Sequence, residues 1–138
     1  MRSRSLIAAA ALAALLPGTV QSQVLTRHDV SLALARTIAD AAVAQCKTDG
    51  FDVSAAVVDR AGDVKLLFRA DTANPHNADL ARRKAYTART YNVSSLEFAK
   101  RTNGTSDLNG QRQLVDVIPL GGALPIRMGN EVIGAIGL

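Results

Sequence analysis

The order in which hydrophobic periodicity changes along the chain most restricts the folds that it can adopt. A helical period over residues 26–48 gives way to two alternating segments, 52–59 and 64–69, joined by a short turn that contains glycine. A helical region follows, and a second alternating pair is arranged around Gly129 and Asn130. Strands joined by short turns pair antiparallel, whereas parallel strands need a longer crossover. The sequence therefore predicts an α+β domain with an antiparallel sheet, and not a βαβ Rossmann arrangement.

Local start and stop signals predict the boundaries of the remaining elements. A hydroxyl or amide side chain before an apolar run is typical of a helix N-cap, and an acidic residue three positions later strengthens it. A short continuous apolar run is consistent with a buried strand. The elements predicted in this way are a first helix opening at Thr26, a helix over residues 78–90 capped by Asn77, a short helix from Ser94 to about Thr102, a strand over residues 114–118 and a final hairpin over residues 124–136.

The N-terminal segment has the pattern of a secretory signal peptide. Two arginines precede an unbroken apolar run over residues 6–16, and small residues stand before a cleavage point after Ser22. The run is too short for a transmembrane helix, which needs about 20 residues. The sequence thus predicts a signal peptide over residues 1–22 and one domain over residues 23–138, located in the periplasm or secreted.

The charge balance argues against nucleic acid as a partner. The chain has 16 Lys and Arg against 12 Asp and Glu, a formal net charge of +4 to which the expected signal peptide contributes. The remaining domain is close to neutral and lacks the basic excess of a nucleic-acid-binding protein. No later segment is long and apolar enough to predict a membrane span. Alanine is frequent and large apolar residues are few, which favours close-packed helices and further burial between subunits.

The densest polar cluster lies over residues 74–91 and predicts an anion site at the start of a helix. His76 stands just before that helix, where backbone N–H groups and the helix dipole favour an anion. Arg83 and Lys84 follow, and on a helix each shares a face with Thr87. A carboxylate at the helix start could pair with these basic groups. A solvated basic face is the alternative interpretation, and spacing alone leaves both open.

Paired glycines and two histidines are the other candidates for a ligand site. Gly121 and Gly122 would let the backbone approach a flat ligand closely, although such a pair also suits a bulge between strands. His28 and His76 could each coordinate iron through a neutral imidazole, and an ordinary surface position is the alternative for each. The sequence contains no zinc-ligand spacing, P-loop, GxGxxG or GxSxG motif.

Taken in order along the chain, five motifs resemble the GlcG/HbpS-like haem-binding family. Each is weak alone, and together they extend over most of the predicted domain. The motifs are VVDRAG at residues 57–62, NP at 74–75, ARRKAYTA at 81–88, GGALPI at 121–126 and VIGAIG at 132–137.

This resemblance implies a profilin-like α/β/α sandwich that assembles into homo-oligomers, from dimers to octamers. It also implies haem as the cofactor, in a pocket near an oligomer interface, and a role as carrier, scavenger or accessory of a sensor protein. Haem degradation is a further activity linked to the family. The residues assigned to the cofactor are Lys84, Thr87, Arg83, His76, His28, Gly121 and Gly122, with His76 and His28 as the candidates for iron.

The family pattern continues past the last glycine motif into a final helix, whereas this sequence stops at Leu138. We therefore expect the C-terminal helix to be missing and one sheet face or subunit contact to be uncovered. Two alternatives to a haem carrier stand: a non-catalytic structural or partner-binding subunit, and an enzyme acting on haem or a small carboxylate. The enzyme would take its acid–base groups from His76, Lys84 or Tyr86. We expect binding rather than catalysis and assign no catalytic residue.

Overall fold

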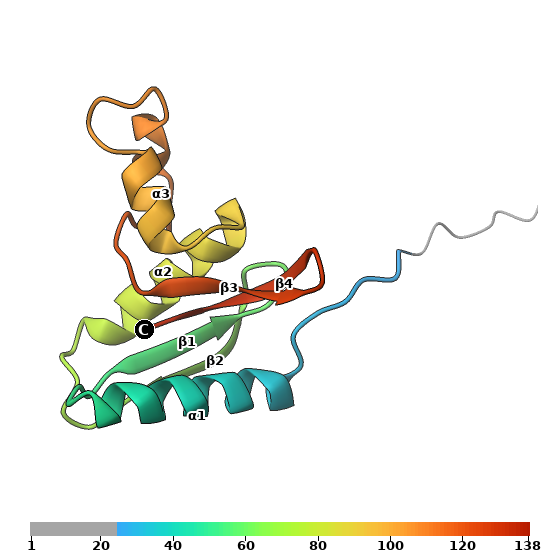
Figure 1. The fold of residues 1–138 in the computed structure, drawn as a ribbon, viewed down its shortest axis with the longest axis vertical. Helices are drawn as coiled ribbons and strands as arrows, with labels where there is room; N and C mark the ends of the chain where they lie inside the picture. The colour runs from blue at the N-terminus through green and yellow to red at the C-terminus, as the bar shows by residue number, and fades with distance from the viewer. Residues whose placement is uncertain (1–24) are drawn as a thin grey trace, which may run out of the picture.

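The computed structural model describes residues 25–138, so the predicted signal peptide lies outside the described residues. Figure 1 shows α1 along one side of a four-stranded sheet and α2 on the other side. In this part of the chain no helix has the length and apolar character needed to span a membrane. The elements in chain order are α1 (Leu32–Thr48), β1 (Ser54–Val58), β2 (Val64–Arg69), α2 (Asn77–Tyr91), α3 (Ser95–Arg101), the 3₁₀ helix η1 (Asn109–Gln113), β3 (Ala123–Met128) and β4 (Glu131–Gly137).

The sheet has the strand order β2-β1-β4-β3, and every neighbouring pair is antiparallel. Val57 of β1 pairs with Leu66 of β2 on one side and with Ile136 of β4 on the other. β1 is therefore a central strand, and all five of its residues are buried. This topology confirms the predicted α+β class with an antiparallel sheet.

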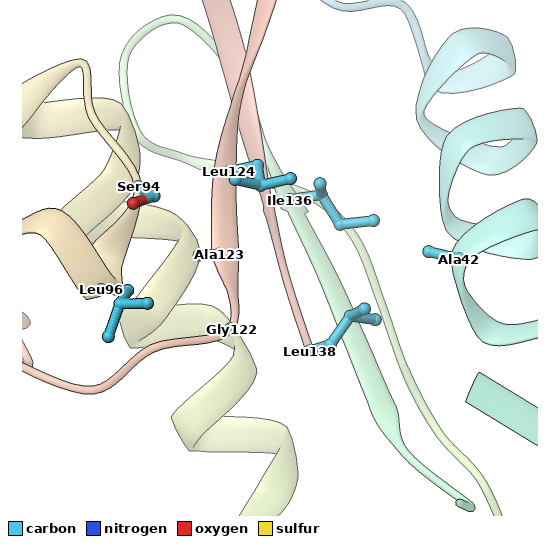
Figure 2. A pocket seen from close by; sticks show the side chains of 8 residues that line it. All are labelled: Ala42, Ser94, Leu96, Gly122, Ala123, Leu124, Ile136 and Leu138. Carbon is cyan, nitrogen blue, oxygen red and sulfur yellow. The ribbon is translucent and has the colours of Figure 1, made fainter. Parts of the chain in front are cut away.

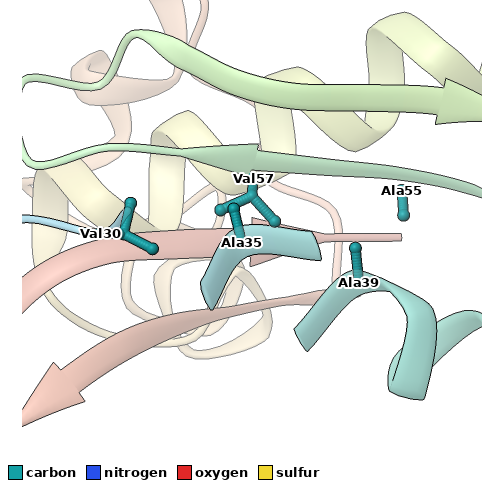
Figure 3. Close-up of a cluster of buried hydrophobic side chains, with 5 residues drawn as sticks. All are labelled: Val30, Ala35, Ala39, Ala55 and Val57. Atoms are coloured by element: carbon teal, nitrogen blue, oxygen red, sulfur yellow. The ribbon is translucent and has the colours of Figure 1, made fainter. Parts of the chain in front are cut away.

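Small side chains hold the three layers together. Successive residues of a strand point to opposite faces of the sheet. Val57 packs with Ala35 and Ala39 of α1 (Figure 3), while the next residue, Val58, packs with Ala85 of α2. Alanine at these contacts lets both helices approach the sheet closely. The result is the α/β/α sandwich that the family resemblance implied.

The first helix begins directly after Ser31, so the predicted start at Thr26 is wrong. The Ser31 hydroxyl accepts a hydrogen bond of 3.1 Å from the backbone of the first turn and is the true N-cap. The preceding residues are held away from the helical conformation because Val30 is buried in the core. The Asp29 carboxylate also accepts the backbone N–H of Val30 at 2.7 Å and that of Arg60 at 2.9 Å. These contacts attach an extended segment to the β1–β2 turn.

The strand predicted over residues 114–118 is absent, and this prediction is wrong. The segment forms a turn, in which Asp116 has a φ of +66°. Leu114 and Val115, the apolar residues that suggested a strand, are exposed. Side chains of α2 take up the hydrogen-bonding groups of this segment, as described below, so that no neighbouring strand is required.

Three further boundary predictions can be compared with the structure. The Ser94 hydroxyl accepts the backbone N–H of Glu97 at 3.1 Å, which confirms the predicted N-cap of the short helix. The final hairpin turns at Gly129 and Asn130, also as predicted. Asn77, in contrast, is the first residue of α2 and not its cap. His76 occupies the cap position and makes no side-chain hydrogen bond to the helix there.

Candidate functional site

Helix α2 lies against the glycine-paired bend that precedes β3. The Lys84 Nζ donates a hydrogen bond of 2.8 Å to the backbone oxygen of Leu138, whose N–H donates to the Gly122 carbonyl at 2.8 Å. Gly122 has a φ of +116°, a conformation that favours glycine. A Cβ at this position would lie 3.1 Å from Lys84 Nζ. Glycine is thus required here both by the backbone conformation and by the Leu138 backbone oxygen, which a Cβ would approach to 2.9 Å.

An apolar pocket of about 380 Å³ opens beside these residues. It lies over the ends of β3 and β4, between α1 and α3, and Figure 2 shows Leu124 and Ile136 on the strands with Ala42 facing them from α1. Leu124 is 61% exposed, so the pocket is open to solvent on that side. Its size and its mainly apolar surface are typical of small-ligand sites. The lining residues are Ala42, Ser94, Leu96, Gly122, Ala123, Leu124, Ile136 and Leu138.

Lys84 does not itself line this pocket, but its ammonium group contacts Leu138 and lies beside Gly122, two residues that do. Its side chain is half-buried, and burial lowers the pKa of Lys84 below the usual lysine value. The ammonium group has three N–H donors, and among residues 25–138 it has one hydrogen-bond acceptor, the Leu138 oxygen. An anionic group at the pocket edge would therefore find unused donors there.

Arg83 and Thr87, two other predicted site residues, hold the segment that follows η1. Arg83 donates a hydrogen bond of 3.0 Å to the backbone oxygen of Val117. The Thr87 hydroxyl is fully buried, donates to the Arg83 carbonyl at 2.8 Å and accepts the backbone N–H of Ile118 at 2.9 Å. Neither residue lines the apolar pocket. In this structure their polar groups serve the fold.

The two histidines are not part of the apolar pocket. His28 Nδ1 lies 2.9 Å from Glu131 Oε2, and Arg60 pairs with the same carboxylate. The hydrogen bonds from His28 and Arg60 lower the pKa of Glu131. His76 is exposed at the start of α2. Within residues 25–138 no group of three or more His, Cys, Asp and Glu side chains is placed to hold a metal ion.

The structure thus brings together three of the predicted residues, namely Lys84, Gly121 and Gly122. Gly121 lies against α3, where a Cβ would be 3.4 Å from the Leu96 Cβ. The apolar lining residues were missed at the sequence level. A signal for two of them was present, because Leu124 and Ile136 are cross-strand partners on one face of the predicted final hairpin.

A three-layer α/β/α fold with a four-stranded antiparallel sheet places this protein in the class of α+β sandwich domains. Comparison with known proteins is more specific, because the family model described as haem degrading protein HbpS-like matches residues 30–138. The chain belongs to this HbpS-like family.

Individual relatives agree with this assignment. A 15.0 kDa protein of Citrobacter freundii, from the dhaT-dhaS intergenic region, is 31% identical over 79% of this chain and 78% of its own length. The crystal structure of an HbpS double mutant from Streptomyces reticuli has a TM-score of 0.79 and 29% identity, covering 99% of this chain and 84% of that one. PduOC, solved as a haem complex, has a TM-score of 0.74 at 22% identity, covering 80% of this chain and 81% of its own, and shows the shared fold.

Proposed function

We propose that this chain is an exported haem-binding protein that holds haem, or a similar flat anionic cofactor, in the apolar pocket. The observation that carries the proposal is the apolar surface formed by β3 and β4, where the lining residue Leu138 accepts a hydrogen bond from the ammonium group of Lys84. Haem combines a large apolar ring with two carboxylates, so it needs an apolar surface with a basic group beside it. The description of the family supports the choice of haem.

The residues present fit such a ligand in two respects. Leu124, Ile136 and Leu138 would contact the ring, and Lys84 would pair with a propionate. Haem, when bound, supplies iron for electron transfer or oxygen chemistry. No histidine, cysteine or methionine is among the described residues that line the pocket. His28 and His76 therefore remain predictions as axial ligands, and the apolar contacts with Lys84 support binding without them.

We further propose that the pocket is completed in a homo-oligomer. Leu124 and Leu96 line the pocket and are both more than half exposed, which leaves an apolar surface that a second copy of the chain could cover. Export follows from the predicted signal peptide over residues 1–22. A role as carrier, scavenger or accessory of a sensor protein is consistent with this arrangement.

Titration with haemin, followed by the Soret absorption band, tests the proposal. We expect saturable binding to the full chain. Leu124→Glu should weaken it about tenfold or more, because a carboxylate on the apolar surface would lose its hydration against the ring. Leu124 is exposed, so this variant should fold. Leu108→Glu, at an exposed leucine outside the pocket, is the matched control and should bind like the unmodified chain. Absence of a saturable Soret change would refute the proposal.

The family description also names haem degradation, and this activity is the second candidate. Incubation of the haemin-loaded protein with a reductant in air would show it as loss of the Soret band and appearance of a product. A stable Soret band under these conditions would favour a carrier over an enzyme.

A further inference from the structure

A second cavity, of about 340 Å³, lies at the opposite end of the β3–β4 hairpin from the apolar pocket and is lined mainly by polar residues. Three arginines from different parts of the chain meet there. Arg60 comes from the β1–β2 turn, Arg89 from the last turn of α2 and Arg127 from β3. Of the described residues that line the cavity, Glu131 alone is acidic, and the others are Asn92, Asn130 and Val132.

Among the described residues 25–138, two of these guanidinium groups have no carboxylate partner. Glu131 is engaged by Arg60 and His28. Arg89 donates to the Asn92 Oδ1 at 3.2 Å, and Arg127 donates to the Asn92 backbone oxygen at 2.6 Å. The Nε of Arg89 is buried and has no hydrogen-bond partner among residues 25–138. A buried N–H group without an acceptor is unfavourable, so the charge of the Arg89 guanidinium is incompletely compensated by the fold.

The electrostatic surroundings of Arg89 also favour an anion in this cavity. Its burial and the nearby charge of Arg60 lower the pKa of Arg89, which means that the cavity disfavours its positive charge. The carboxylates of Asp29 and Asp59 oppose this effect from a distance. Both are already used, because Asp29 accepts two backbone N–H groups and Asp59 pairs with Lys65 at 3.3 Å. An added anion would therefore be favoured.

We propose that this cavity binds a small oxyanion, a phosphate or a carboxylate group, through Arg89 and Arg127, with Arg60 beside them. The planar guanidinium fork matches the oxygens of both groups and forms short, charge-assisted hydrogen bonds with them. The bound oxygens would provide charged acceptors for guanidinium groups whose partners within residues 25–138 are neutral oxygens of Asn92. This site is separate from the apolar pocket, and the proposal stands whether or not the chain binds haem.

Isothermal titration of the full chain with inorganic phosphate, and separately with succinate, tests this proposal. We expect saturable binding of at least one ion, weakened by added salt. The ion that binds more tightly identifies the preferred ligand group as phosphate or as carboxylate. Arg127→Gln and Arg89→Gln should each weaken binding about tenfold or more. Arg36→Gln removes the same charge from an exposed position on α1 and should leave binding unchanged.

Glu131→Gln tests the proposal through an expected gain in anion affinity. It removes the carboxylate that competes for Arg60, so binding should become several-fold tighter. If Arg89→Gln fails to fold, as circular dichroism would show, the exposed Arg127 and the Glu131 variant still decide the question. The proposal is overturned if neither ion binds saturably, or if Arg36→Gln weakens binding as much as Arg127→Gln.

Discussion

The Thr87 hydroxyl group acts both as a hydrogen-bond donor and as an acceptor inside the fold. It donates to the Arg83 carbonyl one turn earlier and accepts from the backbone N–H of Ile118, and its side chain is fully buried. The second bond satisfies an amide in a segment that has no strand partner. A ligand contact of Thr87 and a structural role of Thr87 predict different effects when this residue is substituted.

We expect Thr87→Val to lower the free energy of unfolding by about 1–3 kcal/mol, because the similar volume preserves packing while the Ile118 amide loses its acceptor. Urea unfolding followed by circular dichroism measures this change. Thr105→Val, at an exposed position, should change it by less than about 0.5 kcal/mol. Unchanged stability combined with weaker haemin binding would instead support the ligand role for Thr87.

Gly137 marks the closest approach between α2 and the sheet. An added Cβ would lie 2.8 Å from the Ala85 backbone nitrogen and closer still to the Ala81 carbonyl. Both obstacles are backbone atoms of one helix, so neither can rotate away. We expect Gly137→Ala to cost about 3 kcal/mol in a thermal or urea unfolding experiment. Gly104→Ala, where a Cβ meets nothing within 4 Å, is the control, and similar losses in both variants would contradict the explanation.

At the scale of elements, α2 organises the side of the sheet opposite to α1. Its buried alanines pack on the sheet, and its basic residues hold the segment before β3. Arg82 donates a hydrogen bond of 2.8 Å to the Asp116 carboxylate, and this bond raises the pKa of Arg82. The basic face of α2 is thus directed largely to internal partners, and Lys84 keeps unused donors at a pocket.

Helix α3 and the segment that follows it extend away from the sheet (Figure 1). Arg112 ties this segment back, because its Nε donates to the Thr102 hydroxyl at 3.1 Å and its Nη2 to the Ala99 carbonyl at 2.7 Å. Asn109 adds a hydrogen bond of 3.1 Å to the Thr102 carbonyl. These contacts hold the segment that follows α3 against the helix.

We expect Arg112→Ala to speed amide hydrogen exchange over residues 103–113 and to leave β1 and β4 protected, because the lost contacts are local. Mass spectrometry of exchanged peptides measures the difference. Arg101→Ala removes the same charge from an exposed pair with Glu97 and should have little effect. Faster exchange throughout the sheet would show that Arg112 supports the whole domain.

At the scale of the whole molecule, the core is built from small residues. Phe98 is the largest fully buried side chain, and many of the other buried positions are alanine or valine. Several large apolar residues stay more than half exposed, Leu124 among them. A core of this kind contributes modestly to stability, and association would bury further apolar surface.

If the chain is a homo-oligomer, its unfolding midpoint should rise with protein concentration, because association stabilises only the folded state. Thermal unfolding over a hundredfold concentration range, with sedimentation analysis of the same samples, provides the measurement. A midpoint independent of concentration, together with the mass of a single chain, would contradict the oligomer.

Much of the fold could be predicted from the sequence because periodicity and turn residues act locally. The helical and alternating segments, the two hairpins and the antiparallel sheet follow from them. That Lys84 of α2 lies close to Gly122 was also predicted from the sequence. The start of α1 was missed because burial of Val30 and the contacts of Asp29 come from distant segments.

The sequence by itself determined the order and type of most helices and strands, since that information lies in neighbouring side chains. Only the tertiary structure decided that Thr87 is internal, that residues 114–118 form no strand, that Leu124 remains uncovered and that Arg60, Arg89 and Arg127 share a cavity. Hydrogen-bond partners and exposure depend on residues that are far apart in the chain, and no local pattern specifies them.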